Sequence, residues 1–272
     1  MIDPTPLWDF DDPAGSEQRF REAAADANGA DSLVLLTQAA RALGLQDRFA
    51  EAHDTLDQVL AELRKGAEPR TMAEPRTMAE PDEAPRVDAE VSTRVALERG
   101  RLFRSAGRPD EARPLFEAAV GEARGAGNDA LLVDALHMVA LVVPAEDQGS
   151  LLGEALEVSR SSADPAARRW EASLLNNLGV AHADAGEWEP ALAVFEQALA
   201  ARQVMGKVGD VRIARWMVAW ALRNLGRTGE ALAIQRDLKA ELLAAEEEDP
   251  YVDEELQLLS GGPDSPPMAA PS

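Results

Sequence analysis

The chain has 272 residues, no cysteine and a formal net charge of −22. Such acidity argues against nucleic acid and anionic membranes as partners, since both require a basic face, and the lack of cysteine excludes disulfides and thiolate chemistry. Hydrophobic residues make up 46% of the chain but aromatic residues only 4%, so we expect a helical core built from Ala, Leu and Val. A start that is neither basic nor apolar favours a cytoplasmic location, and the residue usage is typical of a bacterium.

The first segment, residues 1–14, is rich in Pro and Asp and is predicted to be an extended arm. Within it, Leu7-Trp8-Asp9-Phe10-Asp11-Asp12 combines two aromatic with three acidic side chains. Ser16 then begins a short capping helix over about 15–28. Two hypotheses follow for the arm: it folds back as an internal ligand, or it covers the N-terminal end of the helical array.

From residue 31 onward, small and large apolar residues recur in one frame. Small residues are needed where two helices cross closely, and large residues fill the spaces beside them. The frame recurs four times, at Ala40, Leu43, Ala52, Leu56 and Val59; at Gly100, Phe103, Gly107, Ala112, Phe116 and Ala119; at Leu178, Gly179, His182, Gly186, Ala191, Phe195 and Ala198; and at Ala219, Leu222, Gly226 and Ala231. The period is about 40 residues, which predicts stacked helix pairs.

Two segments interrupt this period. The sequence Ala67-Glu68-Pro69-Arg70-Thr71-Met72 is copied at 73–78, and its regular prolines predict a flexible insertion over 67–86. Between the frames at Gly107 and Gly186 there is room for one degenerate pair, which we assign to Asp129–Val143 and Asp147–Ser161.

The recurring frame resembles the tetratricopeptide-repeat superfamily, and its long period is similar to that of kinesin light chains and bacterial regulatory proteins. The resemblance implies an all-α, right-handed solenoid of about five helix pairs with capping helices. We place the pairs at about 31–66, 88–127, 128–163, 166–206 and 209–245, the second cap at about 251–259 and a disordered tail at 260–272, so that the array spans 15–259.

Motifs of catalysis or cofactor binding are absent from the sequence. It has neither a phosphate-binding loop nor a glycine-rich strand-to-helix turn, and its three histidines, His53, His137 and His182, fall in different repeats. We therefore predict no enzyme activity, no cofactor and no metal.

The resemblance also implies where a ligand would bind, because the first helix of each repeat lines the concave surface in this superfamily. The outward positions on these helices are Arg41, Arg101, His137, Val180 and Trp220, preceded one turn earlier by Thr37, Leu97, Val133, Asn176 and Trp216.

Arginines gather at the N-terminal half of this surface. Arg41 is joined by Arg94, Arg101 and Arg104, the last three being spaced to share one helix face. Because arginine binds a carboxylate through two parallel hydrogen bonds, we hypothesise that this end binds an acidic segment or a C-terminal carboxylate. The alternative is that these arginines pair with Glu98 and similar neighbours.

The C-terminal half offers different candidates. Asn176 and Asn177 could hydrogen-bond to an extended peptide backbone, as an asparagine at the place of Asn177 does in several family members. Trp216 and Trp220 share one helix face and, if exposed, would anchor a partner. The alternative for the two tryptophans is packing against the capping segment that holds Val252, Leu256 and Leu259.

The sequence therefore predicts a scaffold that binds a peptide or a partner protein in its groove. The alternative is a regulatory sensor domain that changes shape on binding a signalling peptide and acts through a partner. The partner's identity and the oligomeric state are left open.

Overall fold

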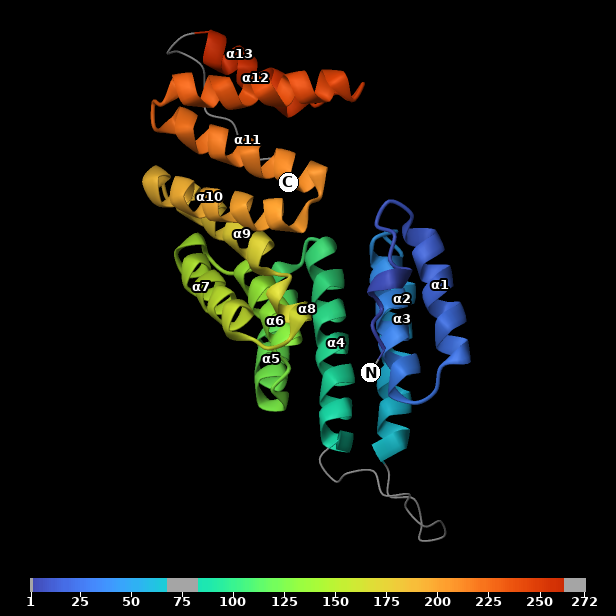
Figure 1. Cartoon of the computed structure of the whole chain (residues 1–272). Coiled ribbons are helices and arrows are strands. Elements are labelled where there is room, and N and C mark those ends of the chain that lie inside the picture. Colours follow the sequence, from blue (N-terminus) through green and yellow to red (C-terminus); the bar gives the residue numbers. More distant parts are fainter. Residues whose placement is uncertain (1, 68–82, 262–272) are drawn as a thin grey trace, which may run out of the picture. The chain divides into compact units, whose positions relative to one another are not determined.

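The computed structural model describes residues 2–67 and 83–261, and in this part of the chain every regular element is a helix (Figure 1). The elements are η1 (Thr5–Leu7), α1 (Pro13–Asp26), α2 (Ala30–Gly44), α3 (Phe49–Ala67), α4 (Glu83–Ser105), α5 (Pro109–Ala126), α6 (Asp129–Ala140), α7 (Ala145–Ser161), α8 (Pro165–Arg168), α9 (Glu171–Asp184), α10 (Trp188–Met205), α11 (Val208–Asn224), α12 (Thr228–Ala244) and α13 (Pro250–Ser260).

Two predicted segments lie largely outside the described residues. Of the insertion predicted over 67–86, residue 67 ends α3 and residues 83–86 begin α4, so the prediction of a flexible segment is wrong at these two edges. Pro85 is compatible with the first turn of α4, where a backbone N–H has no helical partner to lose. Of the predicted tail, Ser260 belongs to α13, and residues 262–272 lie outside the described part.

The sharp turn between paired helices is built the same way four times. The turn residue has a positive φ, near 74° at Gly107, Gly186 and Gly226 and 59° at Asp47. The next residue then donates its N–H to a carbonyl five positions back, which satisfies the end of the first helix. These bonds are Arg48 to Leu43 (3.1 Å), Arg108 to Phe103 (2.9 Å), Glu187 to His182 (2.8 Å) and Arg227 to Leu222 (2.9 Å).

The close helix crossing predicted from the frame is visible in two pairs. A Cβ built on Gly100 of α4 would lie 2.4 Å from the ring of Phe116 on α5, and one built on Gly179 of α9 would lie 2.4 Å from the ring of Phe195 on α10. Both rings are fully buried. The glycines are therefore required because the rings occupy the space that a side chain would need.

The chain divides into two compact units, residues 1–143 and 144–272, which are described separately. The first unit contains η1 and α1–α6, and the second contains α7–α13. The helices assigned to the degenerate repeat, α6 and α7, thus belong to different units.

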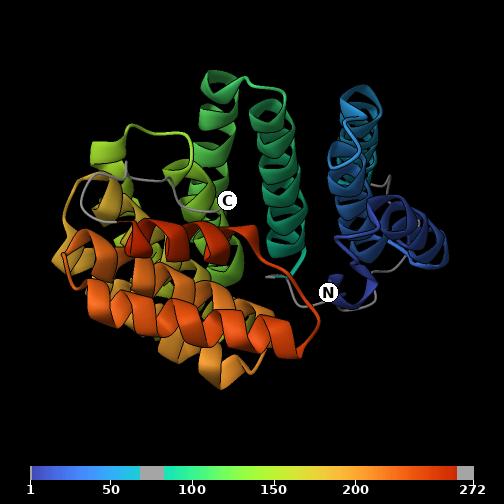
Figure 2. The same ribbon diagram turned by 90° about the horizontal axis from the view of Figure 1, so that it is seen from above.

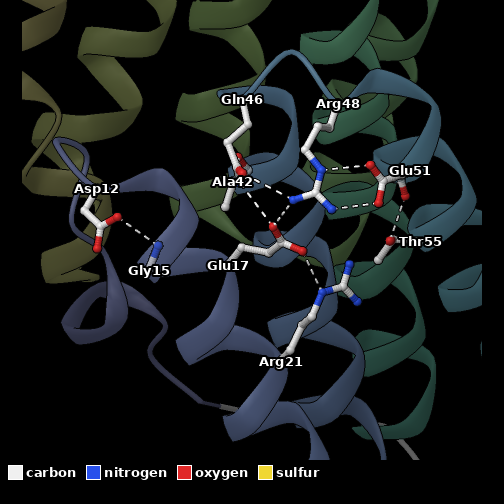
Figure 3. Close-up of polar contacts among 9 residues, drawn as sticks. All are labelled: Asp12, Gly15, Glu17, Arg21, Ala42, Gln46, Arg48, Glu51 and Thr55. Carbon is white, nitrogen blue, oxygen red and sulfur yellow. Dashed lines mark hydrogen bonds and ion pairs between the residues drawn. The ribbon is translucent and has the colours of Figure 1, made fainter.

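In the first unit, α1 is fastened to the α2–α3 pair by the buried carboxylate of Glu17 (Figure 3). Glu17 accepts hydrogen bonds from Arg21 (2.8 Å), from Arg48 (2.6 Å) and from Gln46 (3.1 Å). Burial acts to raise the pKa of Glu17, but these donors outweigh it and lower the pKa. Arg48 also pairs with Glu51 on α3, so one guanidinium links α1 to α3.

The arm, residues 2–12, lies against α1 and α2 and includes the short helix η1. The backbone N–H of Ile2 donates to Asp31 (2.8 Å), and the Nε of Arg19 donates to the carbonyl of Leu7 (3.0 Å). Asp9 and Ser16 bond reciprocally at 2.8 Å through the Asp9 backbone and the Ser16 hydroxyl. The arm is consequently held by polar contacts at residues 2, 7 and 9.

In the second unit, α13 covers the pair α11–α12, which lies beside it in Figures 1 and 2. Val252 of α13 is 2% exposed within the core of this unit. Glu255, which is fully buried, accepts two hydrogen bonds from Arg223 at 2.9 and 3.0 Å. A buried carboxylate with both oxygens bonded to arginine fixes the direction of α13 on α11.

Candidate functional site

Polar side chains of the first unit converge where its first helices α2, α4 and α6 present their outward positions. Arg41 lies on α2, Glu98 and Arg101 on α4, and Asp134 and His137 on α6. The spacing of three residues on α4 and on α6 places each of those pairs on one helix face. We call these five residues the charged cluster.

Arg101 is the centre of the charged cluster. Its guanidinium donates to Glu98 (2.8 Å) and forms an ion pair with Asp134, and all three side chains are at most 14% exposed. Burial acts to lower the pKa of Arg101, but the two carboxylates raise it overall. The same contacts lower the pKa of Asp134, although burial opposes this effect. Both groups therefore remain charged at neutral pH, and Arg101 joins α4 to α6.

Arg41 differs from Arg101 because it has no ion pair among the described residues. Its pKa is lowered by burial and by the neighbouring charge of Arg101, while the charges of Glu98 and Asp134 act in the opposite direction. Its guanidinium carbon lies 5.6 Å from the ring centre of Trp8 and 5.8 Å from that of Phe10. Aromatic faces thus cover a cation that no carboxylate of residues 2–67 or 83–261 neutralises directly.

His137 completes the charged cluster on α6. Burial lowers its pKa, Asp134 partly opposes this, and Arg101 and Arg104 lower it further. The imidazole is therefore neutral at pH 7. Arg41, Arg101 and the exposed Arg104 then face two carboxylates, which leaves an excess of positive charge in a chain of net charge −22.

Arg94, another predicted binding residue, lies one turn away from the charged cluster and is neutralised. It donates two hydrogen bonds to Glu90, at 2.9 and 3.1 Å, and its side chain is 19% exposed. For Arg94 and Arg101 the structure has the pairing that the alternative interpretation described, whereas Arg41 and Arg104 have no ion pair in the described residues.

The predicted asparagines lie on α9 in the second unit, where both are half-buried. The Oδ1 atom of Asn176 is buried and accepts no hydrogen bond from any described residue. Asn176 and Asn177 are adjacent on a helix, so their side chains point about 100° apart and cannot line one surface together.

Trp216 and Trp220 of α11 are only 3% and 4% exposed, so they do not present open rings to a partner. The Nε1 of Trp216 donates to the carbonyl of Tyr251 (3.3 Å), and Trp220 packs edge-on against Trp188 at 5.0 Å. A terminal repeat must cover its apolar flank, and α13 does so here. Packing against the capping segment agrees with the structure for Trp216, whereas Trp220 packs against α10, and the exposed-anchor interpretation is wrong for both residues.

Sequence reasoning missed two members of this region, Asp134 and Gln38. Asp134 precedes His137 by one turn in an otherwise apolar helix, and that isolated charge was the available signal. Gln38 precedes Arg41 by one turn and accepts a hydrogen bond from the indole of Trp8 (3.1 Å). No sequence signal singled it out, because its role depends on where the arm lies.

Within residues 2–67 and 83–261, no group of acidic or histidine side chains is arranged to hold a metal ion. None of the helices described there combines the length and the apolar character needed to span a bilayer.

Comparison with known proteins agrees with the geometry. Residues 172–207 match the family model described as tetratricopeptide repeat, and no curated protein sequence matches the chain. Three solved structures are similar. BtubC (BKLC) from P. vanneervenii is 18% identical, the match covers 92% of this chain and 95% of that one, and the TM-score is 0.63. The TPR-like repeats of a kinesin light chain from Podosopora anserina are 17% identical, with 81% of this chain and 99% of that one covered and a TM-score of 0.58, and the apo quorum sensor NprR from B. thuringiensis is 12% identical, with 93% of this chain and 64% of that one covered and a TM-score of 0.60. The predicted all-α repeat fold and the predicted resemblance are confirmed.

Proposed function

Since the chain carries a tetratricopeptide repeat and has the helical-array fold of that superfamily, we propose that it is a non-catalytic protein-interaction scaffold. Its binding surface is formed by the outward positions of α2, α4 and α6 in the first unit, with Arg41, Arg101, Arg104 and His137 as the central residues. The bound group is an acidic peptide segment or a C-terminal carboxylate of a partner protein.

One observation carries this proposal: Arg41 is a largely buried cation with no ion pair in the described structure, beside a second arginine that has two. A buried charge that lacks a partner is costly, and a ligand carboxylate would remove that cost. Because a guanidinium can donate two parallel hydrogen bonds, the site favours a carboxylate over a neutral amide.

Arg101 has a positioning role in this proposal. Its donors are directed at Glu98 and Asp134, so they are not available to a ligand. Its ion pairs with Glu98 and Asp134 instead hold α4 and α6 together beside α2. The positive charge of Arg101 adds to the electrostatic potential that attracts an anion toward Arg41.

A regulatory sensor is a second candidate function. The similarity to the quorum sensor NprR favours it, since that protein shares the repeat fold over 93% of this chain. A sensor would change its solution shape on binding, whereas a scaffold would not. Small-angle scattering with and without a bound peptide distinguishes the two, because the sensor predicts a changed radius of gyration.

The test of the proposed function is a binding screen of acidic peptides with free and with amidated C-termini. We expect Arg41→Gln to weaken the tightest peptide by about tenfold or more, because a hydrogen-bonded charge pair is lost. Arg113→Gln on α5 is the matched control, since Arg113 pairs at the surface with Glu117 (2.7 Å), and we expect it to change affinity less than about twofold.

Equal binding by wild type and Arg41→Gln would show that the acidic group does not bind at this site. A screen in which no acidic peptide binds would contradict the proposed ligand class.

A further inference from the structure

The arm covers the outward position of α2 where Arg41 lies. Trp8 contacts two polar side chains of this helix, because its indole donates to Gln38 (3.1 Å) and its ring lies over Arg41. Phe10 stacks on Trp8 with ring centres 4.7 Å apart and planes 2° apart, and it also lies over Arg41. Two aromatic side chains of one short segment thus occupy the place where a ligand would meet this arginine.

The two aromatic side chains of the arm are packed to different extents. Trp8 packs edge-to-face against the fully buried ring of Phe20, with ring centres 4.9 Å apart. Phe10, by contrast, is 60% exposed although it is a large apolar side chain. Displacing a phenylalanine that is already this exposed gives up little buried area, so the segment around residue 10 is the part of the arm that can open.

The arm also has the composition of the ligand class proposed for this site. Asp9, Asp11 and Asp12 flank the two aromatics, so the segment presents carboxylates next to rings that pack on a guanidinium. Because it is joined to α1 by a short connection, its effective concentration at Arg41 is high, about millimolar or more for a tether of this kind. A segment of modest intrinsic affinity would therefore occupy the site most of the time.

We infer that residues 2–12 act as an internal ligand that covers Arg41 and competes with an external acidic partner for the first-unit surface. This inference rests on the proposed function for the identity of the site, and it adds a regulatory step, because the partner must displace Trp8 and Phe10 before it reaches the guanidinium. The apparent affinity for an external partner then depends on how much more tightly the partner binds than the arm does, and not on the partner's contacts alone.

The experiment supplies the arm as a separate molecule. A fluorescent peptide with the sequence of residues 2–12 is titrated into the full-length wild type and into the full-length double variant Trp8→Ala/Phe10→Ala, with binding followed by anisotropy. We expect saturable binding to the double variant and binding at least tenfold weaker to wild type, whose own arm fills the site. Adding Arg41→Gln to the double variant should abolish the gain.

Two controls show whether the peptide binding is specific. A peptide carrying alanine in place of both aromatics should bind neither protein, and the circular dichroism of the double variant should match that of wild type. If the double variant does not fold, Phe10→Ala alone replaces it, since this exposed side chain contributes little to the core, and it should bind the peptide at least threefold more tightly than wild type.

Equal binding of the peptide by wild type and the opened variant, or no binding by either, would overturn the internal-ligand inference. This assay needs no external partner. A negative result in this assay therefore does not decide whether other acidic peptides bind at Arg41, which the separate peptide screen tests. The two proposals can fail independently.

Discussion

The pairs α4–α5 and α9–α10 share the same packing but present different outer surfaces. In both pairs a glycine on the first helix receives a fully buried phenylalanine ring at the same spacing. Outward from this shared contact, α4 carries the buried pair Glu98–Arg101, whereas α9 carries Asn177 and Val180 at the same positions. The frame therefore sets how helices stack, and the residues between frame positions determine what each unit can bind.

The largest expected effect comes from Arg101, which is specific to the first unit. Arg101→Leu leaves Glu98 and Asp134 buried without their shared cation, so we expect a loss of about 3–5 kcal/mol in the free energy of unfolding. Urea denaturation of the full chain measures it. Arg215→Leu in the second unit removes a pair with the half-exposed Glu241 and serves as the control, with an expected loss below about 1 kcal/mol.

The shared contact is tested by Gly100→Ala and Gly179→Ala. Each new methyl group would clash with a fully buried ring, so we expect both substitutions to destabilise by about 1–3 kcal/mol and by similar amounts. Gly121→Ala on α5 has open space at its Cβ and should stabilise by about 0.5–1 kcal/mol, because alanine favours a helix. If the two frame glycines tolerate alanine as well as Gly121 does, the two pairs do not share this packing.

A third pair, α11–α12, shows what happens when the frame residue changes. Ala219 stands where the other two pairs have glycine, and Gln235 stands where they have phenylalanine. Gln235 is fully buried, and neither atom of its amide has a hydrogen-bond partner among the described residues. Gln235→Met keeps the length of the side chain and removes the unpaired amide, so we expect stabilisation by about 1–2 kcal/mol in thermal or urea unfolding. A destabilised Gln235→Met variant would show that the amide is paired in solution.

The smallest effect concerns pH and the histidine of the first-unit cluster, His137. In the folded first unit the pKa of His137 lies below its usual 6.5, chiefly because of burial. Below pH 6.5 the unfolded chain therefore binds more protons than the folded one, and stability falls as the pH decreases. We expect the melting temperature to drop between pH 7.5 and 5.5 and to drop less in His137→Gln. An unchanged slope in this variant would remove His137 as a cause.

The stacking of the helices could be predicted from the sequence, because small residues at helix crossings recur with a fixed spacing. The turn between α2 and α3 was harder to predict, since Asp47 there adopts the positive φ that glycine adopts in the other three turns. An aspartate can occupy that conformation at a modest cost, so the position carries no glycine for a pattern to detect.

The binding residues were harder to predict for a physical reason. Periodicity identifies which side chains leave the helix on one face, but it does not identify what covers them. Trp216 and Trp220 share a face as expected and both are buried; α13 covers Trp216, and the arm covers Arg41. Both covers come from segments outside the repeats, whose positions depend on tertiary contacts that repeat spacing does not encode.

The central claim, that an acidic ligand binds the first-helix surface of the first unit, is tested most directly by amide hydrogen exchange. Exchange is measured with and without the tightest acidic peptide from the screen. The account predicts slower exchange in α2, α4 and α6, faster exchange around residues 8–10 as the arm is displaced, and unchanged exchange in α9 and α11. Protection confined to α9 and α11, with the first unit unaffected, would contradict it.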